Sequence, residues 1–174
     1  MPTPVPAGAN VYDSALDLEP LLTPEQRTAY GAHALTRFPT WLVVVLHYPT
    51  LGIFTLVYQG LKLSKLPLVR ESDFRAGKGI GLNFVPFYGY YWVFRFVNGI
   101  NDRLNFQLRL RGERPRSPRG LGIACCVLWV IPFYTALVTW LVLMPLMSAY
   151  MQSATNRLVD LREREAAATP PPAG

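Results

Sequence analysis

Residues 83–96 read NFVPFYGYYWVFRF, and eight of these fourteen residues are aromatic. The core of a small soluble domain has little room for so many rings, and it would also have to bury the arginine. Tyrosine and tryptophan favour the lipid–water interface, where the ring is apolar and its OH or NH stays hydrated. We therefore expect this stretch to contact a bilayer. Its interfacial residues would be Tyr88, Tyr90, Tyr91 and Trp92, with Arg95 reaching up to lipid phosphate.

The composition of the whole chain supports a membrane environment. Of 174 residues, 51% are hydrophobic and 16% are charged, whereas soluble domains carry about 25% charged residues. We predict an all-α, helical integral membrane protein. Its membrane domain would span residues 39–161, with apolar segments at 41–61, 79–98 and 120–150.

Prolines interrupt these apolar segments. The first segment has 21 residues without a charged side chain, enough to cross the hydrocarbon core. From residue 120 onward the chain has 37 consecutive uncharged residues, which as one helix would be about 55 Å long. That length exceeds the bilayer core of about 30 Å. We expect a bend or hairpin near Pro132, and helix continuing past Pro145 to about Arg164.

The ends of the chain differ from the middle. Residues 1–22 and 162–174 are predicted to be disordered tails, since both carry Pro, Ala and Gly runs. A short surface helix is expected over 23–38. Its start is marked by a capping box, with Thr23 as N-cap, Pro24 at the first helical position and Gln26 three residues after the cap.

The segments that connect the apolar stretches are basic. Residues 62–78 hold five basic and two acidic side chains, and residues 102–119 hold six basic and two acidic ones. Their net charges are therefore +3 and +4, and the positive-inside rule favours the cytoplasm for both. Three simple crossings would put them on opposite sides. Either the segment at 79–98 is re-entrant or shallow, or it crosses and the charge rule fails here.

Short motifs recur along the chain. YPTLG (48–52), VPFYG (85–89) and IPFYT (131–135) each place a proline beside aromatic residues, which is compatible either with an internal repeat or with shared composition. The stretch 84–105 resembles a family of small uncharacterised bacterial multi-helix inner-membrane proteins. The positions that carry the resemblance are Pro86, Phe87, Tyr91, Trp92, Phe94, Gly99 and Asn105. The resemblance implies a multi-pass protein of the bacterial inner membrane and no transferable activity.

Motifs for catalysis, cofactors or metals are missing from the sequence, so no enzyme activity is expected. AGKGIG (76–81) lacks the ending of a phosphate-binding loop and is predicted to be a flexible loop. His47 is an intramembrane polar candidate, either a proton relay or ligand, or a residue that packs and hydrogen bonds. Cys125 and Cys126 are predicted to be buried small side chains rather than reactive thiols.

The remaining signals concern partners. Arg109 and Arg111, in an arginine-rich segment between membrane segments, are expected to meet anionic headgroups rather than nucleic acid. A heptad-like series near the C-terminus would pack either on the protein's own body or on a second copy: Met147, Met151, Ala154, Leu158 and Leu161.

The expected function is that of a structural, regulatory or accessory component of a membrane assembly, within a larger complex or as a homo-oligomer. The alternative is a small transporter or channel subunit, built from proline-broken helices. Such a subunit would need a polar cavity drawn from the few polar residues of the apolar segments: His47, Thr50, Thr55, Gln59, Thr135 and Thr139.

Overall fold

The computed structural model describes residues 22–70, 73–85, 87–130 and 133–168, and these residues form helices and no strands. The predicted all-α class is therefore confirmed. The elements are α1 (Pro24–Gly31), α2 (Thr40–His47), α3 (Ile53–Lys65), α4 (Ala76–Gly81), η2 (a 3-10 turn, Leu82–Phe84), α5 (Tyr88–Leu110), α6 (Arg119–Val130), α7 (Phe133–Val138), η3 (a π-helical segment, Thr139–Leu143) and α8 (Met144–Ala168).

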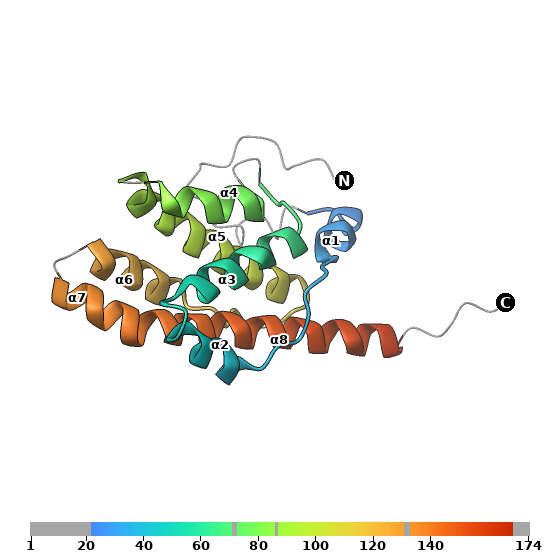
Figure 1. The fold of residues 1–174 in the computed structure, drawn as a ribbon. Coiled ribbons are helices and arrows are strands. Elements are labelled where there is room, and N and C mark those ends of the chain that lie inside the picture. Colours follow the sequence, from blue (N-terminus) through green and yellow to red (C-terminus); the bar gives the residue numbers. More distant parts are fainter. Residues whose placement is uncertain (1–21, 71–72, 86, 131–132, 169–174) are drawn as a thin grey trace.

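The helices run as three antiparallel pairs (Figure 1). In that view α2, α4 and α6 each lead toward the left, and α3, α5 and the α7–α8 helix each return toward the right. Residues near the left-hand ends of all three pairs line one common pocket, among them Gly52, Phe84 and Trp140. The two basic segments, 62–78 and 102–119, include the right-hand ends of α3 and α5 and the loops after them. They therefore lie toward the same end of the molecule.

The first apolar segment is not one helix. It forms α2 and α3, with a tight turn between them at 48–52. The turn is closed by Gly52, whose N–H donates to the carbonyl of His47 over 2.8 Å and whose φ is +82°. Its 21 uncharged residues are therefore divided at the proline motif YPTLG, because a proline at position 49 and a left-handed glycine both end regular helix.

By length and composition, one helix among the described residues is long and apolar enough to cross a bilayer. It is the continuous run Thr135–Ala168, of 34 residues. It passes Pro145 as expected and reaches Ala168, beyond the predicted Arg164. Residues 162–168, expected to belong to a disordered tail, are therefore helical. Pro132 lies outside the described residues, but α6 and α7 end and begin on either side of it and pack against each other.

The core lies between α5 and α8. Trp92, Ile100 and Leu104 of α5 pack in one buried cluster with the heptad-like series of α8. Four members of that series are fully buried and the fifth, Leu161, packs against the cluster: Met147, Met151, Ala154 and Leu158. The series therefore lies on the protein's own body. Cys125 and Cys126 are free and buried in the same cluster, as predicted.

AGKGIG at 76–81 is a helix, α4, and the prediction of a flexible loop was wrong. Close packing with α3 explains the difference. A Cβ added at Gly60 would lie 2.4 Å from the Ile80 side chain, and one added at Gly79 would lie 2.9 Å from Leu63. The small residues let the two helices approach, and that burial outweighs the low helix propensity of glycine.

We expect Gly89→Ala to destabilise the fold by about 1–3 kcal/mol, because overpacking against rigid backbone forces a shift. A Cβ at Gly89 would lie 2.6 Å from the backbone oxygen of Asn83. Gly120→Ala is the matched control near the start of α6, where nothing lies within 4 Å. It should be neutral or slightly stabilising. Thermal unfolding in detergent measures both, and equal effects of the two substitutions would contradict the assigned packing.

Candidate functional site: an apolar pocket between the helix pairs

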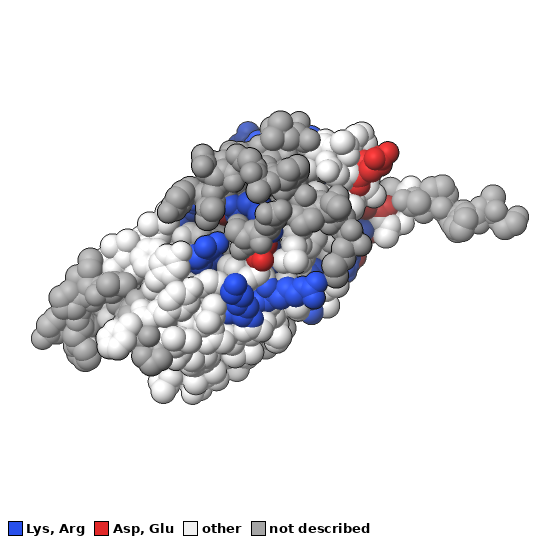
Figure 2. All heavy atoms as spheres, turned by 90° about the horizontal axis from the view of Figure 1, so that it is seen from above, with Lys and Arg blue, Asp and Glu red and all other residues white. Residues whose placement is uncertain are grey.

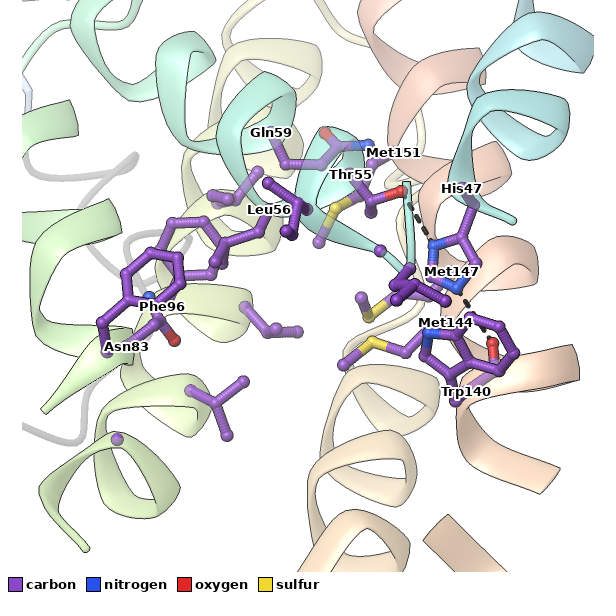
Figure 3. Close-up of a pocket in the computed structure, with 18 of the residues that line it drawn as sticks. His47, Thr55, Leu56, Gln59, Asn83, Phe96, Trp140, Met144, Met147 and Met151 are labelled. Carbon is purple, nitrogen blue, oxygen red and sulfur yellow. Dashed lines mark hydrogen bonds between the residues drawn. The ribbon is translucent and has the colours of Figure 1, made fainter. Parts of the chain in front are cut away.

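A cavity with a volume of about 440 Å³ lies where the three helix pairs meet (Figure 3). Its walls come from the α2–α3 turn, α3, the η2–α5 junction, α5 and the η3–α8 helix. The side chains that line it are aliphatic, aromatic or thioether, apart from four: His47, Thr55, Gln59 and Asn83. None of the lining residues carries a formal charge, apart from what protonation of His47 would add.

His47 is held from two sides. Its Nδ1 lies 2.9 Å from the hydroxyl of Thr55, and its Nε2 lies 3.0 Å from the backbone carbonyl of Trp140. Since a carbonyl can only accept, Nε2 carries the proton, and in the neutral ring Nδ1 accepts from Thr55. Both ring nitrogens are therefore occupied within the protein. This arrangement corresponds to the packing and hydrogen-bonding alternative for His47 rather than to a free ligand or relay.

Pro145 explains why the carbonyl of Trp140 is available. Proline has no N–H, so it cannot bond a carbonyl of the preceding turn. The chain adapts by forming the π-helical segment η3, in which Met144 donates to the carbonyl of Thr139, five residues back. The carbonyl of Trp140 then accepts from His47, and that of Leu141 accepts from the hydroxyl of Tyr48 over 2.9 Å. His47 and Tyr48, at the end of α2, thereby stabilise the π-helical segment.

Two non-glycine residues among those described have positive φ, and both lie at the pocket. Leu51 has φ +51° and Phe87 has φ +59°. Such conformations cost about 1–3 kcal/mol each and persist only where the surroundings impose them. Both side chains are exposed, Leu51 by 73% and Phe87 by 88%. The two strained positions thus hold large apolar side chains at the outer rim of the pocket.

The inner end of the pocket is polar and fully buried. Gln59 is 2% exposed, and its Nε2 donates to the carbonyl of Ser148 while its Oε1 has no hydrogen-bond partner. One turn away, the buried ammonium of Lys62 donates to Oε1 of Gln152 over 2.8 Å. The hydroxyl of Tyr58 donates to the same oxygen. These polar side chains, Tyr58, Gln59, Lys62 and Gln152, form a layer between the pocket and the charged end of the molecule.

The predicted interfacial aromatic residues separate into two groups. Tyr88 and Tyr91 are exposed, as an interfacial position requires, and the side chain of Tyr90 lies outside what the structure describes. Trp92, in contrast, is buried, stacks on Tyr88 and donates its indole N–H to the carbonyl of Gly79. The prediction that Trp92 lies at the lipid interface is therefore wrong. Trp92 instead joins α5 to α4. Arg95 is half-buried.

The two predicted headgroup arginines also differ. Arg109 is exposed near the end of α5. Arg111 is instead held by the protein: its guanidinium donates to the carbonyl of Gly31 over 2.7 Å and pairs with Glu165 at 3.1 Å. Its predicted role at a headgroup is therefore corrected to a link between the α1 end, α5 and α8.

Charged residues gather at one end of the molecule. On the face that Figure 2 shows, Lys, Arg, Asp and Glu lie over the middle and right, and the described residues toward the left are white. Ion pairs between described residues tie the C-terminal half of α8 to the segment before α2 and to the end of α5 and its following loop. Others tie the segment after α3 to α5. They include Arg37–Asp160, Arg70–Asp102, Arg103–Asp73, Arg111–Glu165 and Arg157–Glu113.

Arg103 is the most deeply buried charge at that end. It is 1% exposed, donates to the carbonyl of Phe74 over 2.8 Å and pairs with Asp73 at 3.4 Å. Burial raises the pKa of the neighbouring Asp102, although Arg119 and Arg70 oppose the rise. Sequence reasoning did not single out these residues. The available signal was the polar series Asn101, Asp102, Arg103 and Asn105, which fills little more than one turn of a helix and is buried on all sides in the fold.

Replacing His47 by Ala should lower stability by about 1–3 kcal/mol, because the carbonyl of Trp140 and the hydroxyl of Thr55 are left buried without a partner. Tyr48→Phe removes one bond at a half-exposed position and should cost less than about 1 kcal/mol. Thermal unfolding in detergent measures both substitutions. A His47→Ala protein as stable as Tyr48→Phe would remove the central role given to this histidine.

The stability of the fold should depend on pH through His33. Burial, then the nearby Arg111 and Arg162, lower its pKa from 6.5 to about 4. The unfolded chain therefore binds the proton first. The contribution of His33 to the free energy of unfolding is therefore complete above pH 6.5. It is lost as the pH falls to about 4, by up to about 1.4 kcal/mol per pH unit. His33→Gln should flatten the stability profile between these pH values; an unchanged slope would exclude His33 as its source.

No protein-family model, no curated protein and no solved structure matches this chain. Groups of three or more side chains suited to hold a metal ion are missing from the described part of the chain. The pocket, the exposed apolar residues and the placement of charge are therefore the observations on which a function can be argued.

Proposed function

We propose that this is an integral protein of the bacterial inner membrane that acts as a structural, regulatory or accessory component of a membrane assembly. The observation that supports the proposal most is the number of large apolar side chains that are exposed. We call the following ones the apolar surface. It comprises Trp41, Val45, Tyr48, Leu51, Ile53, Phe84, Val85, Phe87, Tyr88, Tyr91, Ile123, Val127, Leu137, Val138, Leu141, Val142 and Leu146. Soluble monomers rarely expose contiguous apolar patches larger than a few hundred Å².

The arrangement of the helices supports an orientation. The three helix pairs run away from the charged end and return to it, so the two basic segments share one side of the bilayer under this proposal. Their net charges of +3 and +4 then both satisfy the positive-inside rule. All three pairs are re-entrant in this proposal, so each enters and leaves the bilayer on the charged side, although the Thr135–Ala168 helix has the length and composition of a spanning helix.

A small transporter or channel subunit is the second candidate, and one observation favours it. Three of the polar residues that such a subunit would need, His47, Thr55 and Gln59, do line the same pocket. However, both ring nitrogens of His47 are occupied, and the hydroxyl of Thr139 bonds the carbonyl of Thr135 in its own helix. The polar groups thus serve internal bonds, and the accessory function is the better supported of the two.

Membrane residence and orientation can be tested in one experiment. Single cysteines replace the exposed residues Ser64, Arg114 and Ala167 in a Cys125→Ala, Cys126→Ala background, and intact cells are treated with a membrane-impermeant maleimide. We expect the protein to stay in the pellet after alkaline carbonate extraction, and all three cysteines to react only after lysis. Each site lies at the charged end.

The controls separate two kinds of failure. A cysteine at a known periplasmic position of another membrane protein must react in intact cells. Release of the protein by carbonate would overturn membrane residence itself. Reaction of one cysteine but not the others in intact cells would leave membrane residence standing and defeat the re-entrant arrangement.

A further inference from the structure

The pocket has the size and lining of a ligand site. Small-molecule sites are concave, mostly apolar and about 300–1,000 Å³ in volume, with a few polar groups that fix orientation. This pocket has a volume of about 440 Å³ and an apolar lining. Packed interiors contain few voids larger than a water molecule, and an apolar cavity is a poor site for water. A pocket of this volume that opens into lipid would therefore be filled by part of a lipid-like molecule.

The rim of the pocket indicates how such a molecule would enter. Leu51, Ile53, Phe84 and Phe87 line the pocket and are more than half exposed. All four belong to the apolar surface, so the inference rests on the proposed function, which places that surface in the hydrocarbon core. Deeper in, Gln59, Met147 and Met151 are 3% exposed or less. The pocket thus runs from a lipid-facing rim to a closed inner end.

The polar groups of the pocket restrict the ligand further. The indole N–H of Trp140 lies on the pocket side of its ring (Figure 3), and the structure gives it no hydrogen-bond partner among the described residues. At the inner end, Oε1 of Gln59 is an acceptor without a partner. Both groups are uncharged, and among the residues that the structure describes no Lys, Arg, Asp or Glu lines the pocket. A charged headgroup would lose its hydration there without compensation.

We propose that the pocket binds a long aliphatic chain next to one uncharged hydrogen-bonding group, either an ester carbonyl or a hydroxyl. A carbonyl would accept from the indole N–H of Trp140, and a hydroxyl could also donate to Gln59. The aliphatic chain of the ligand would pack among Leu56, Met144 and Met147. The flexible thioethers of the two methionines adapt to an irregular apolar partner. A membrane lipid and a free single-chain alcohol share this chemistry.

The test uses two photoreactive probes in vesicles of phosphatidylethanolamine and phosphatidylglycerol. One probe is a diazirine-bearing fatty alcohol, and the other is a phosphatidylcholine with the diazirine in one acyl chain. The full-length protein is reconstituted, irradiated and digested, and adducts are mapped by mass spectrometry. We expect adducts at Leu56, Met144 or Met147 that saturate with probe concentration and are displaced by unlabelled oleyl alcohol. Reaction with the phospholipid identifies a bilayer lipid as the source, and reaction with the alcohol alone identifies a free amphiphile.

Substitutions test whether the pocket itself is occupied. Leu56→Trp and Met144→Trp, made separately, fill the space of the chain and should lower pocket adducts by about tenfold. Val142→Trp is the matched control, since Val142 is exposed on the apolar surface and does not line the pocket. It should leave the pocket adducts unchanged. Melting temperature and elution volume of each variant show that it is folded, and two independent variants guard against misfolding of one.

Two outcomes would overturn the inference. Adducts confined to outer positions such as Val142, rising without saturation, would show annular lipid contact only. A pocket protected by contact with a second copy, seen as cross-linked dimer without pocket adducts, would assign the rim to self-association. In either case a protein that resists carbonate extraction keeps its proposed membrane residence. A protein released by carbonate that still shows saturable pocket adducts would lose the proposed function while retaining the site.

Discussion

The bond from His47 to the carbonyl of Trp140 is the contact on which this architecture depends. A proline inside an apolar helix normally leaves a carbonyl without its donor, and in lipid no water is present to replace it. Here Pro145 is buried, the chain shifts into a π-helical segment, and the end of a different helix pair supplies the missing donors. The turn that ends α2 therefore also fixes the shape of the α7–α8 helix, and His47 and Trp140 lie side by side in the wall of the pocket.

Charge placement is the second constraint, and it acts at the other end of the molecule. Arg103 has less than its full set of partners, so its position depends on Asp73 and the carbonyl of Phe74. Removing one partner of a buried ion pair destabilises a fold more than replacing the whole pair by apolar residues does, because it leaves the other charge buried and unpaired. The network of ion pairs thus joins the returning ends of the helices, and it allows the opposite ends to be free of charge. Segregation of this kind is what an amphipathic bilayer favours.

Helix content, the capping box at Thr23 and the burial of Cys125 and Cys126 could be predicted from the sequence, since each rests on local pattern or side-chain chemistry. The division of residues 41–61 into two helices could not be, because length and hydrophobicity are the same for a broken and an unbroken segment. α4 was missed for a related reason: its glycines weaken helix locally, and only contact with α3 reverses that preference. Trp92 and Arg111 were placed on the lipid-facing surface because composition does not reveal which face of a helix is covered.

The strained residues connect the fold to the pocket. Leu51 and Phe87 adopt positive φ although neither is glycine, and each lies within one of the proline motifs of the chain, YPTLG and VPFYG. If the chain continued as regular helix through YPTLG or VPFYG, Leu51 and Phe87 would project from the side of that helix. No turn would then separate the helices, and the pocket between the pairs would not form. The break leaves a turn instead, and the turn extends a large apolar side chain outward at the rim. The same interruptions that shorten the helices therefore create the cavity and its apolar rim, so the pocket follows from the way the helices are broken rather than from loose packing.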